Sequence, residues 1–300
     1  MTEVRCALVS AEQDEPLLGT APEATDFLLV EMRGGWAGKI LATEMPEDVR
    51  RFLSPLEKAH RGLRLQFIRA PRRSRGPLAV YLCRVGGPVS YLMLNQLEDL
   101  PAVDVGAWLA DGTVAGAVRE AEALTLVCTH GRRDVCCSLL GVPLYDALVA
   151  QKLVRPADEP PTVWQASHLG GHRFAPVVLS LPDGHCYGRV GVDEAAEFLR
   201  AQAQGMVHRP TRLRGCTKDA PWAQAASVTY RIETDERAFD AIVDGMQLST
   251  VGDAQHVTLR TRGGSLRVEV QREVRADALR PASCGETPEP TTCWRARLAS

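Results

Sequence analysis

The chain has 300 residues, of which 45% are hydrophobic, and its formal net charge is −2 at pH 7. This length predicts about two domains, and the hydrophobic content is sufficient for a buried core. The small net charge and the 5% content of aromatic residues argue against a nucleic-acid-binding protein, and no apolar run approaches the ~20 residues of a membrane helix.

The first block of predicted elements covers residues 1–115. A strand is expected at 27–31, a helix at 46–59, and further strands at 63–68, 78–84 and 91–94. We therefore predict an N-terminal α/β block with the order strand, helix, strand, strand.

The second block covers residues 116–205 and begins with a short apolar strand at 124–128. A helix is expected at 137–149, with an interruption near Gly141-Val-Pro143 as one option, followed by a strand at 162–167. Residues 176–190 predict two strands joined by the turn Pro182-Asp-Gly184, and a helix follows at 192–203. This is the element order of a thioredoxin-like α/β layer. The first block has a similar order without a shared motif, so a divergent copy is one interpretation of it.

The third block covers residues 206–300. Residues 227–232 alternate apolar and polar side chains, as a strand does, and a helix is expected at 236–246. A hairpin should pair 256–262 with 265–270 across Gly263-Gly264. We expect a small C-terminal α+β appendage with a proline-rich tail that carries Cys284, Cys293 and Trp294.

Nine cysteines are present, and no N-terminal apolar run of signal-peptide length precedes them. This usage favours a reducing cytoplasm, where cysteines are metal ligands or buried thiols more often than disulfides. The most informative cysteines are Cys128 and Cys137, which begin and end a ten-residue segment. His168-Leu-Gly-Gly-His172 follows about thirty residues later.

These four residues predict a site with two thiolates and two imidazoles. Cys128 stands at a strand end and Cys137 where the next helix should begin, so the two sulfurs can converge on one side. Gly170 and Gly171 between the histidines allow a tight turn with positive φ. A Cys₂His₂ set also suits zinc, but zinc cysteines are usually two to four residues apart, and eight residues separate these two. Rieske centres use the same ligand types in a different order.

The pattern Cys-Thr-His-Gly-x-Arg-Asp-x-x-Cys, followed by His-x-Gly-Gly-His and by Tyr187-Gly188-Arg189, resembles the sucrase/ferredoxin-like family. Cys6, Gly19-Thr-Ala21 and residues 27–31 resemble the N-terminal block of that family, so the likeness covers most of the chain. Gly34-Gly-Trp36 departs from the Gly-Pro-Trp-Gly-like turn expected there.

The resemblance implies a thioredoxin-like ferredoxin domain with a 2Fe-2S cluster held by Cys128, Cys137, His168 and His172. The family spacing selects Cys137, and Cys136 is the alternative ligand. The family name suggests sucrose cleavage, but no convincing pair of catalytic carboxylates is present.

Other residues near the motif have two interpretations each. One interpretation of His130, Arg132, Arg133 and Asp134 is that they donate hydrogen bonds to a cluster or orient the ligand loop through an Arg–Asp pair; the other is a solvated loop in which Asp134 caps the helix. Cys136 is either a buried neighbour or a spare thiol. We expect His185 and Cys186 to be ordinary strand residues, Cys6, Cys83 and Cys216 to pack in the interior, and Cys284 and Cys293 to be free thiols. Trp294 either packs or docks on an electron donor.

The predicted function is that of a one-electron carrier rather than a catalyst with its own substrate. A flavin-type reductase would supply the electrons to an acceptor that the sequence does not name. Two imidazoles in place of thiolates predict a moderate reduction potential, and an exposed ligand imidazole would couple electron to proton transfer. The alternatives are a zinc-stabilised interaction module and a thiol reductase, although the sequence has no Cys-x-x-Cys active site.

Overall fold

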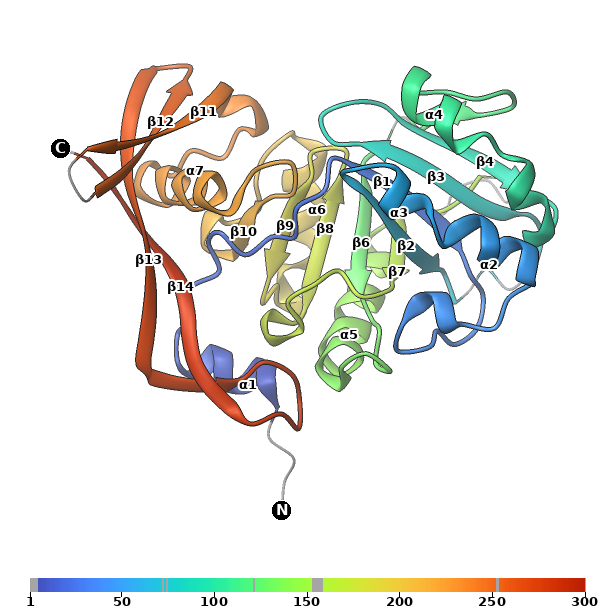
Figure 1. The fold of residues 1–300 in the computed structure, drawn as a ribbon, viewed down its shortest axis with the longest axis horizontal. Helices are drawn as coiled ribbons and strands as arrows, with labels where there is room; N and C mark the ends of the chain where they lie inside the picture. Colours follow the sequence, from blue (N-terminus) through green and yellow to red (C-terminus); the bar gives the residue numbers. More distant parts are fainter. Residues whose placement is uncertain are drawn as a thin grey trace.

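The computed structural model describes residues 5–71, 73, 75–120, 122–152, 159–251 and 254–299. Within these residues, a ten-stranded mixed sheet crosses the molecule and a four-stranded antiparallel sheet stands at one end of it (Figure 1). The strand order in the large sheet is β10-β9-β8-β6-β7-β2-β1-β3-β4-β5. The fold is therefore mixed α/β with a C-terminal β-rich part, as the sequence predicts.

One half of the large sheet is formed by four strands with their connecting helices, here called the first repeat. Strand β1 is parallel to β2 and antiparallel to β3, and β3 is antiparallel to β4. The elements in chain order are β1 (Asp26–Glu31), α2 (Glu47–Leu53), α3 (Leu56–Ala59), β2 (Leu63–Arg69), β3 (Leu78–Arg84), β4 (Val89–Leu94) and α4 (Val105–Asp111).

The other half, the second repeat, has the same connectivity. Strand β6 is parallel to β7 and antiparallel to β8, and β8 is antiparallel to β9. The elements in chain order are β6 (Leu124–Cys128), α5 (Val135–Gln151), β7 (Val163–Ala166), β8 (Val177–Leu181), β9 (His185–Gly188) and α6 (Ala195–Ala203).

The two repeats meet where β2 pairs with β7 in antiparallel fashion, with Ile68 opposite Ala166. Identical strand order and direction in both halves support the interpretation of the first block as a divergent copy. Strand β5 (Val118–Arg119) pairs with β4, and β10 (Leu213–Cys216) pairs with β9. The sheet thus continues past residues 115 and 205, and the three-domain division stays a prediction.

Helices cover one face of each repeat. In the first repeat, Val49 and Trp108 share a core cluster with Leu28 and Phe67. In the second repeat, side chains of α5 and α6 share a core cluster with Val127 of β6 and with residues of the neighbouring strands. A further core cluster contains strand residues of both repeats together with Leu17 of the N-terminal lead and Phe174 of the loop after β7. The loop that carries His168 and His172 is therefore packed into the core shared by the two repeats.

Two predicted helices differ in detail from the structure. The helix expected at 46–59 is divided at Ser54-Pro55 into α2 and α3. Helix α5, by contrast, continues without interruption through Gly141 and Pro143. Short 3₁₀ helices are η1 (Ile40–Ala42), η2 (Leu97–Ala102), η3 (His172–Phe174), η4 (Val192–Glu194), η5 (Pro210–Arg212) and η6 (Phe239–Ala241).

The strand expected at 227–232 is wrong, because these residues lie in α7 (Pro221–Thr234). Every residue from Ala223 to Arg231 is buried, since α7 contacts both β10 and the strands of the small sheet. Within residues 227–232 the polar side chains of Ser227, Thr229 and Arg231 are buried and alternate with apolar ones, so this short window has the pattern of a strand. The helix expected at 236–246 is also wrong. Asp235, with φ of 54°, closes α7, and β11 (Ile242–Val251) follows η6.

The hairpin across Gly263-Gly264 is confirmed, joining β12 (Ala254–Thr261) to β13 (Gly264–Pro281). Strand β13 then pairs with β14 (Pro288–Leu298), and this long hairpin extends from the small sheet along one side of the molecule to α1 (Cys6–Glu12) (Figure 1). The turn of the hairpin thereby brings Cys284 beside Cys6 of α1 and the start of α5.

Glu15 joins this hairpin to the loop after β7. Its carboxylate is 1% exposed and accepts hydrogen bonds from Ser10 (2.7 Å), Arg173 (2.8 Å) and Arg280 (3.1 Å). Burial raises the pKa of Glu15, but Arg173, Ser10 and Arg280 outweigh it, so the pKa lies below the ordinary 4.5. The ion pairs stabilise the charged carboxylate in the folded state.

We expect Glu15→Gln to lower the free energy of unfolding by about 3 kcal/mol at pH 7, because buried Arg280 and partly buried Arg173 lose their counter-charge. Since the folded pKa is below the unfolded one, this contribution is complete above the unfolded pKa and disappears as the pH falls through the folded pKa. Urea unfolding at pH 7 and below pH 4 measures it, with exposed Glu12→Gln as control. A pH-independent difference would contradict the prediction.

Candidate metal centre

The β6–α5 connection places Cys128 and Cys137 together. Cys128 is the last residue of β6, and Asp134 caps α5 by accepting a 2.9 Å hydrogen bond from the Cys136 backbone N–H. The ligand atoms of Cys128, Cys137 and His168 all lie within 4.8 Å of one another, and Cys137 Sγ is 4.0 Å from His168 Nδ1. The structure therefore brings together three of the four predicted ligand residues.

Gly141 determines how closely α5 approaches β6. A Cβ atom at this position would lie 2.1 Å from the carbonyl oxygen of Cys128. The absence of a side chain thus lets the helix that carries Cys137 pack directly on the strand end that carries Cys128.

We expect Gly141→Ala to reduce the free energy of unfolding by about 1–3 kcal/mol, the usual cost of overpacking, because a backbone atom cannot move aside as a flexible side chain can. It should also weaken metal retention, since α5 must shift away from Cys128. Thermal unfolding and metal analysis of the same preparation measure both effects. Gly35→Ala is the control, since its added methyl would contact nothing within 4 Å. Equal behaviour of the two variants would refute the packing argument.

The loop after β7 is fixed by glycines and an arginine. Gly170 and Gly171 both have positive φ, 86° and 73°, as the sequence predicts. Buried Arg214 donates a 2.8 Å hydrogen bond to the Gly170 carbonyl, and a Cβ atom on Gly171 would lie 2.5 Å from its guanidinium. The glycines are therefore required both for the turn and for the approach of Arg214.

His130 orients His168 through the backbone. The backbone N–H of His168 donates to His130 Nδ1 (3.2 Å), and His130 Nε2 donates to the carbonyl of Ala37 (2.9 Å). Burial lowers the pKa of His130, which keeps the imidazole neutral and able to accept. Arg64 donates to the His168 carbonyl at 3.2 Å. Of the two interpretations of His130, orientation of the ligand loop is the one that these contacts support.

His172 lies beside His168, with 5.2 Å between the ring centroids, but outside the 4.8 Å group. Its Nε2 donates to the carbonyl of Ala282 (2.5 Å) and is 2.9 Å from Ser283 Oγ. Its Nδ1 is buried and has no hydrogen-bond partner among the described residues. A buried polar atom without a partner is uncommon, and it often marks the place of an ion or ligand.

The protonation of the group suits metal binding. The Cys137 thiol donates a hydrogen bond to Cys128, which lowers the pKa of Cys128 well below its ordinary value and raises that of Cys137. One thiolate is thus favoured in a buried pair. Burial lowers the pKa of His172, which keeps that imidazole neutral. A thiolate and a neutral imidazole are the forms that bind metals.

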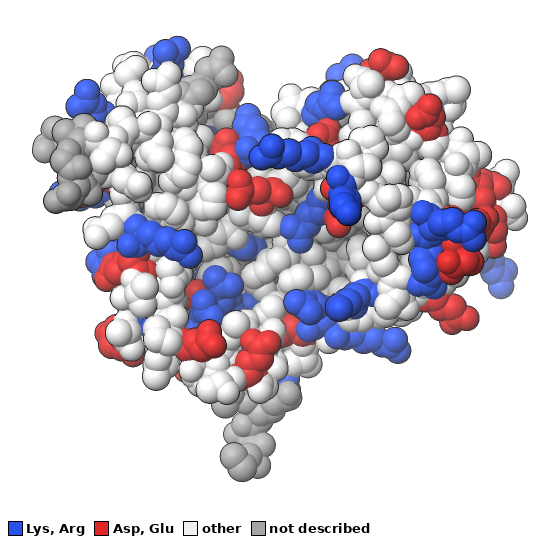
Figure 2. Space-filling model, in the orientation of Figure 1, with Lys and Arg blue, Asp and Glu red and all other residues white. Residues whose placement is uncertain are grey.

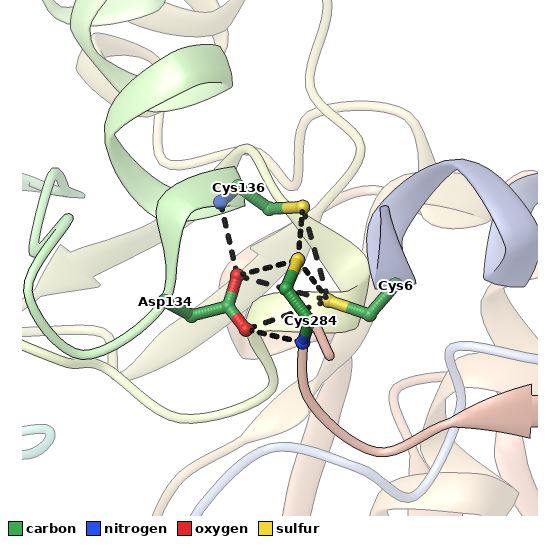
Figure 3. Close-up of side chains that lie close together, drawn as sticks. All are labelled: Cys6, Asp134, Cys136 and Cys284. Atoms are coloured by element: carbon green, nitrogen blue, oxygen red, sulfur yellow. Dashed lines mark hydrogen bonds between the residues drawn. The ribbon is translucent and has the colours of Figure 1, made fainter. Parts of the chain in front are cut away.

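Cys136 belongs to a different group of side chains. Its Sγ lies 3.8 Å from that of Cys6 and 3.3 Å from that of Cys284 (Figure 3). Asp134 lies in the same group, in addition to capping α5. Sequence reasoning missed this group, because Cys6 and Cys284 are more than 120 residues from Cys136.

The other residues considered in the sequence analysis lie outside the candidate metal centre. All nine cysteines are free, and Cys83, Cys216 and Cys293 are buried. His185 and Cys186 lie in β9, where His185 Nδ1 is 2.6 Å from Asp183. Trp294 packs so closely on Gly19 that a Cβ there would lie 2.4 Å from the indole, which supports the packing interpretation.

The fold and the site define a mixed α/β protein with a cysteine–histidine group that could hold a metal. A family model described as Sucrase/ferredoxin-like matches residues 17–215, two thirds of the chain, and the chain belongs to this family. The match includes both repeats and all four predicted ligands. Comparison with curated proteins and with solved structures gave no significant match.

Among the described residues, none of the helices combines the length and the apolar character needed to span a bilayer.

Proposed function

We propose that this protein is a one-electron carrier with a 2Fe-2S cluster held by Cys128, Cys137, His168 and His172. The proposal rests on the arrangement of these residues as a cysteine pair next to a histidine pair. Two buried cysteines favour a thiolate, and beside them stand two adjacent imidazoles, one of which has a buried nitrogen without a partner among the described residues.

The two thiols and two imidazoles fit a 2Fe-2S cluster. Thiolate and imidazole are its established protein ligands, and the unpaired Nδ1 of His172 would acquire a bond. The bound cluster would accept and release one electron, at a moderate potential because two neutral imidazoles replace two thiolates. We assign one iron to the cysteine pair and the other to the histidine pair.

The surrounding residues would hold the ligands in place. His130 and Arg64 fix the backbone of His168, and Arg214 fixes the glycine turn. Hydrogen bonding of His172 Nε2 to Ala282 leaves Nδ1 as the ligating nitrogen. Cys128 and Cys137 are 2% and 0% exposed, so water is excluded from the sulfur side.

Electrons would enter and leave on the His168 side. His168 is only partly buried and lines a surface hollow together with Lys39, Arg64, Arg133 and Glu57. A flavin-type reductase is the proposed donor. Acidic and basic side chains are interspersed on the face drawn in Figure 2, which suits a protein partner better than a nucleic acid. The nine free thiols suit a cytoplasmic location.

Proton coupling is part of the proposal, since oxidation of the cluster would favour loss of a proton from a ligand imidazole that solvent can reach. The midpoint potential should then fall as the pH rises. A midpoint potential that is constant at all accessible pH values would reject proton coupling, but it would not reject the role as an electron carrier.

Metal and sulfide analysis of anaerobically purified protein tests the proposal. We expect iron and acid-labile sulfide in equal amounts, about two of each per chain, and a visible absorption that dithionite bleaches. The competing zinc module has an observation in its favour, because three ligand atoms within 4.8 Å suit a single ion. A colourless protein that loses zinc on His168→Ala would establish that module and reject the electron carrier.

A further inference from the structure

A second group of metal-binding side chains lies beside the candidate metal centre. It contains three cysteines and one aspartate, Cys6, Asp134, Cys136 and Cys284, whose ligand atoms all lie within 4.8 Å of one another (Figure 3). Cys6 begins α1, Asp134 and Cys136 stand at the start of α5, and Cys284 lies in the turn between β13 and β14. Three distant parts of the chain therefore meet here.

Three members of the group are shielded from solvent, and Cys284 is partly buried. Cys6 and Cys136 are 0% and 1% exposed, and Asp134 is 5% exposed. The carboxylate is fixed by backbone N–H groups, because Cys136 N donates to Oδ1 and Cys284 N donates to Oδ2, both at 2.9 Å. A buried carboxylate among three thiols needs positive charge to compensate it.

Five of the six distances between the ligand atoms lie between 3.3 and 3.8 Å, close to the edges of a tetrahedron around one ion. The three Sγ–Sγ distances are 3.8, 3.3 and 3.7 Å, and Asp134 Oδ1 lies 3.3 Å from Cys284 Sγ and 3.8 Å from Cys6 Sγ. Tetrahedral zinc with Zn–S of ~2.3 Å and Zn–O of ~2.0 Å has S–S edges of about 3.8 Å and S–O edges of about 3.5 Å.

Neither a disulfide nor a two-iron cluster accounts for the whole arrangement. A disulfide would use two sulfurs at ~2.05 Å and would leave the third thiol and the carboxylate without a role. A cluster of two irons would distribute its ligands over two metal atoms, whereas these four converge on one point. Thiolate-rich tetrahedral sites select Zn²⁺ among the common divalent ions.

We propose that Cys6, Asp134, Cys136 and Cys284 form a structural Zn²⁺ site. Binding would release the three thiol protons, and the complex would carry the same formal charge as a Cys₄ zinc site. The ion would fasten α1 and the β13–β14 turn to the start of α5.

The zinc site would also support the candidate metal centre. Ala282 and Ser283, which hold His172 Nε2, immediately precede Cys284, and Asp134 Oδ2 is 3.7 Å from His172 Nε2. Loss of zinc would therefore make His172 less well ordered but would leave all four proposed cluster ligands in the chain, so iron should stay bound. The zinc site itself does not depend on which group the other centre binds.

Zinc and iron analysis of purified full-length variants tests the inference. We expect about one zinc per chain in wild type, in Cys137→Ser and in the control Cys293→Ser, and at least ten-fold less in Cys6→Ser and Cys284→Ser. Cys293 is a matched control, since it is buried on β14 outside both groups. The iron content should depend on Cys137, and the zinc content should depend on Cys6 and Cys284. The two contents therefore distinguish failure of one site from failure of the other.

Cobalt substitution tests the site in the wild-type protein, so the result does not depend on whether the variants fold. Wild-type protein stripped of zinc and titrated with Co²⁺ should show thiolate charge-transfer bands and the visible bands of a tetrahedral ion. Zinc retained at wild-type level in Cys284→Ser would overturn the proposal. A zinc-free wild type with a Cys136–Cys284 disulfide and no tetrahedral cobalt spectrum after reduction would do so too.

Discussion

Serine at position 137 is expected to remove bound iron from the protein, whereas serine at position 136 is expected to leave it bound. The two cysteines are adjacent in sequence, but Cys137 faces Cys128 and His168 while Cys136 faces Cys6 and Cys284. Mutation of a residue that only hydrogen-bonds to a metal ligand typically lowers metal affinity 10–100-fold. Loss of a ligand thiolate should therefore lower the iron content by more than ~10-fold.

Iron per chain and visible absorption, measured on both variants after anaerobic purification, check this result. Each variant removes one buried thiol from the start of α5, so the pair controls for general destabilisation. Equal iron loss in both variants, or iron retained in Cys137→Ser, would contradict the assignment of Cys137.

Cysteine in place of His172 is expected to keep a cluster and to lower its midpoint potential. The change replaces a neutral ligand with an anionic one, which favours the oxidised state. Histidine ligation of one iron raises 2Fe-2S potentials by at least ~250 mV, so one replacement should lower the potential by on the order of 100 mV. Redox titration of wild type and variant measures the difference.

His60→Cys is the matched control for this variant, since it adds the same side chain after α3, away from the ligand loop. Its potential should equal that of wild type. An unchanged potential in His172→Cys would mean that His172 is not a ligand, and its hydrogen bond to Ala282 would then be its only role.

The local parts of the fold and of the metal centre could be predicted from sequence, because local spacing determines them. Strand ends, the Pro182-Asp-Gly184 turn and the glycines between the two histidines depend on neighbouring residues, and the structure has them as expected. The convergence of Cys128, Cys137 and His168 follows from adjacent parallel strands β6 and β7. The fourth ligand depends partly on Ala282, 110 residues away, which spacing does not indicate.

The rest of the fold depends on contacts between distant segments. Residues 227–232 of α7 have the sequence pattern of a strand, because buried polar side chains alternate there with apolar ones. The repeated topology is evident only from strand pairing, since the first repeat shares no motif with the second. The group around Asp134 requires the long β13–β14 hairpin to reach α1, and local sequence indicates neither the length nor the direction of that hairpin.

Pulsed EPR of the dithionite-reduced protein with ¹⁵N-labelled histidine would show whether histidines ligate the cluster. We expect a 2Fe-2S signal of low average g with hyperfine couplings from two imidazole nitrogens, which change with the label and fall to one in His172→Cys. A reduced-cluster signal without histidine nitrogen coupling, or the absence of any signal from protein that contains only zinc, would contradict this expectation.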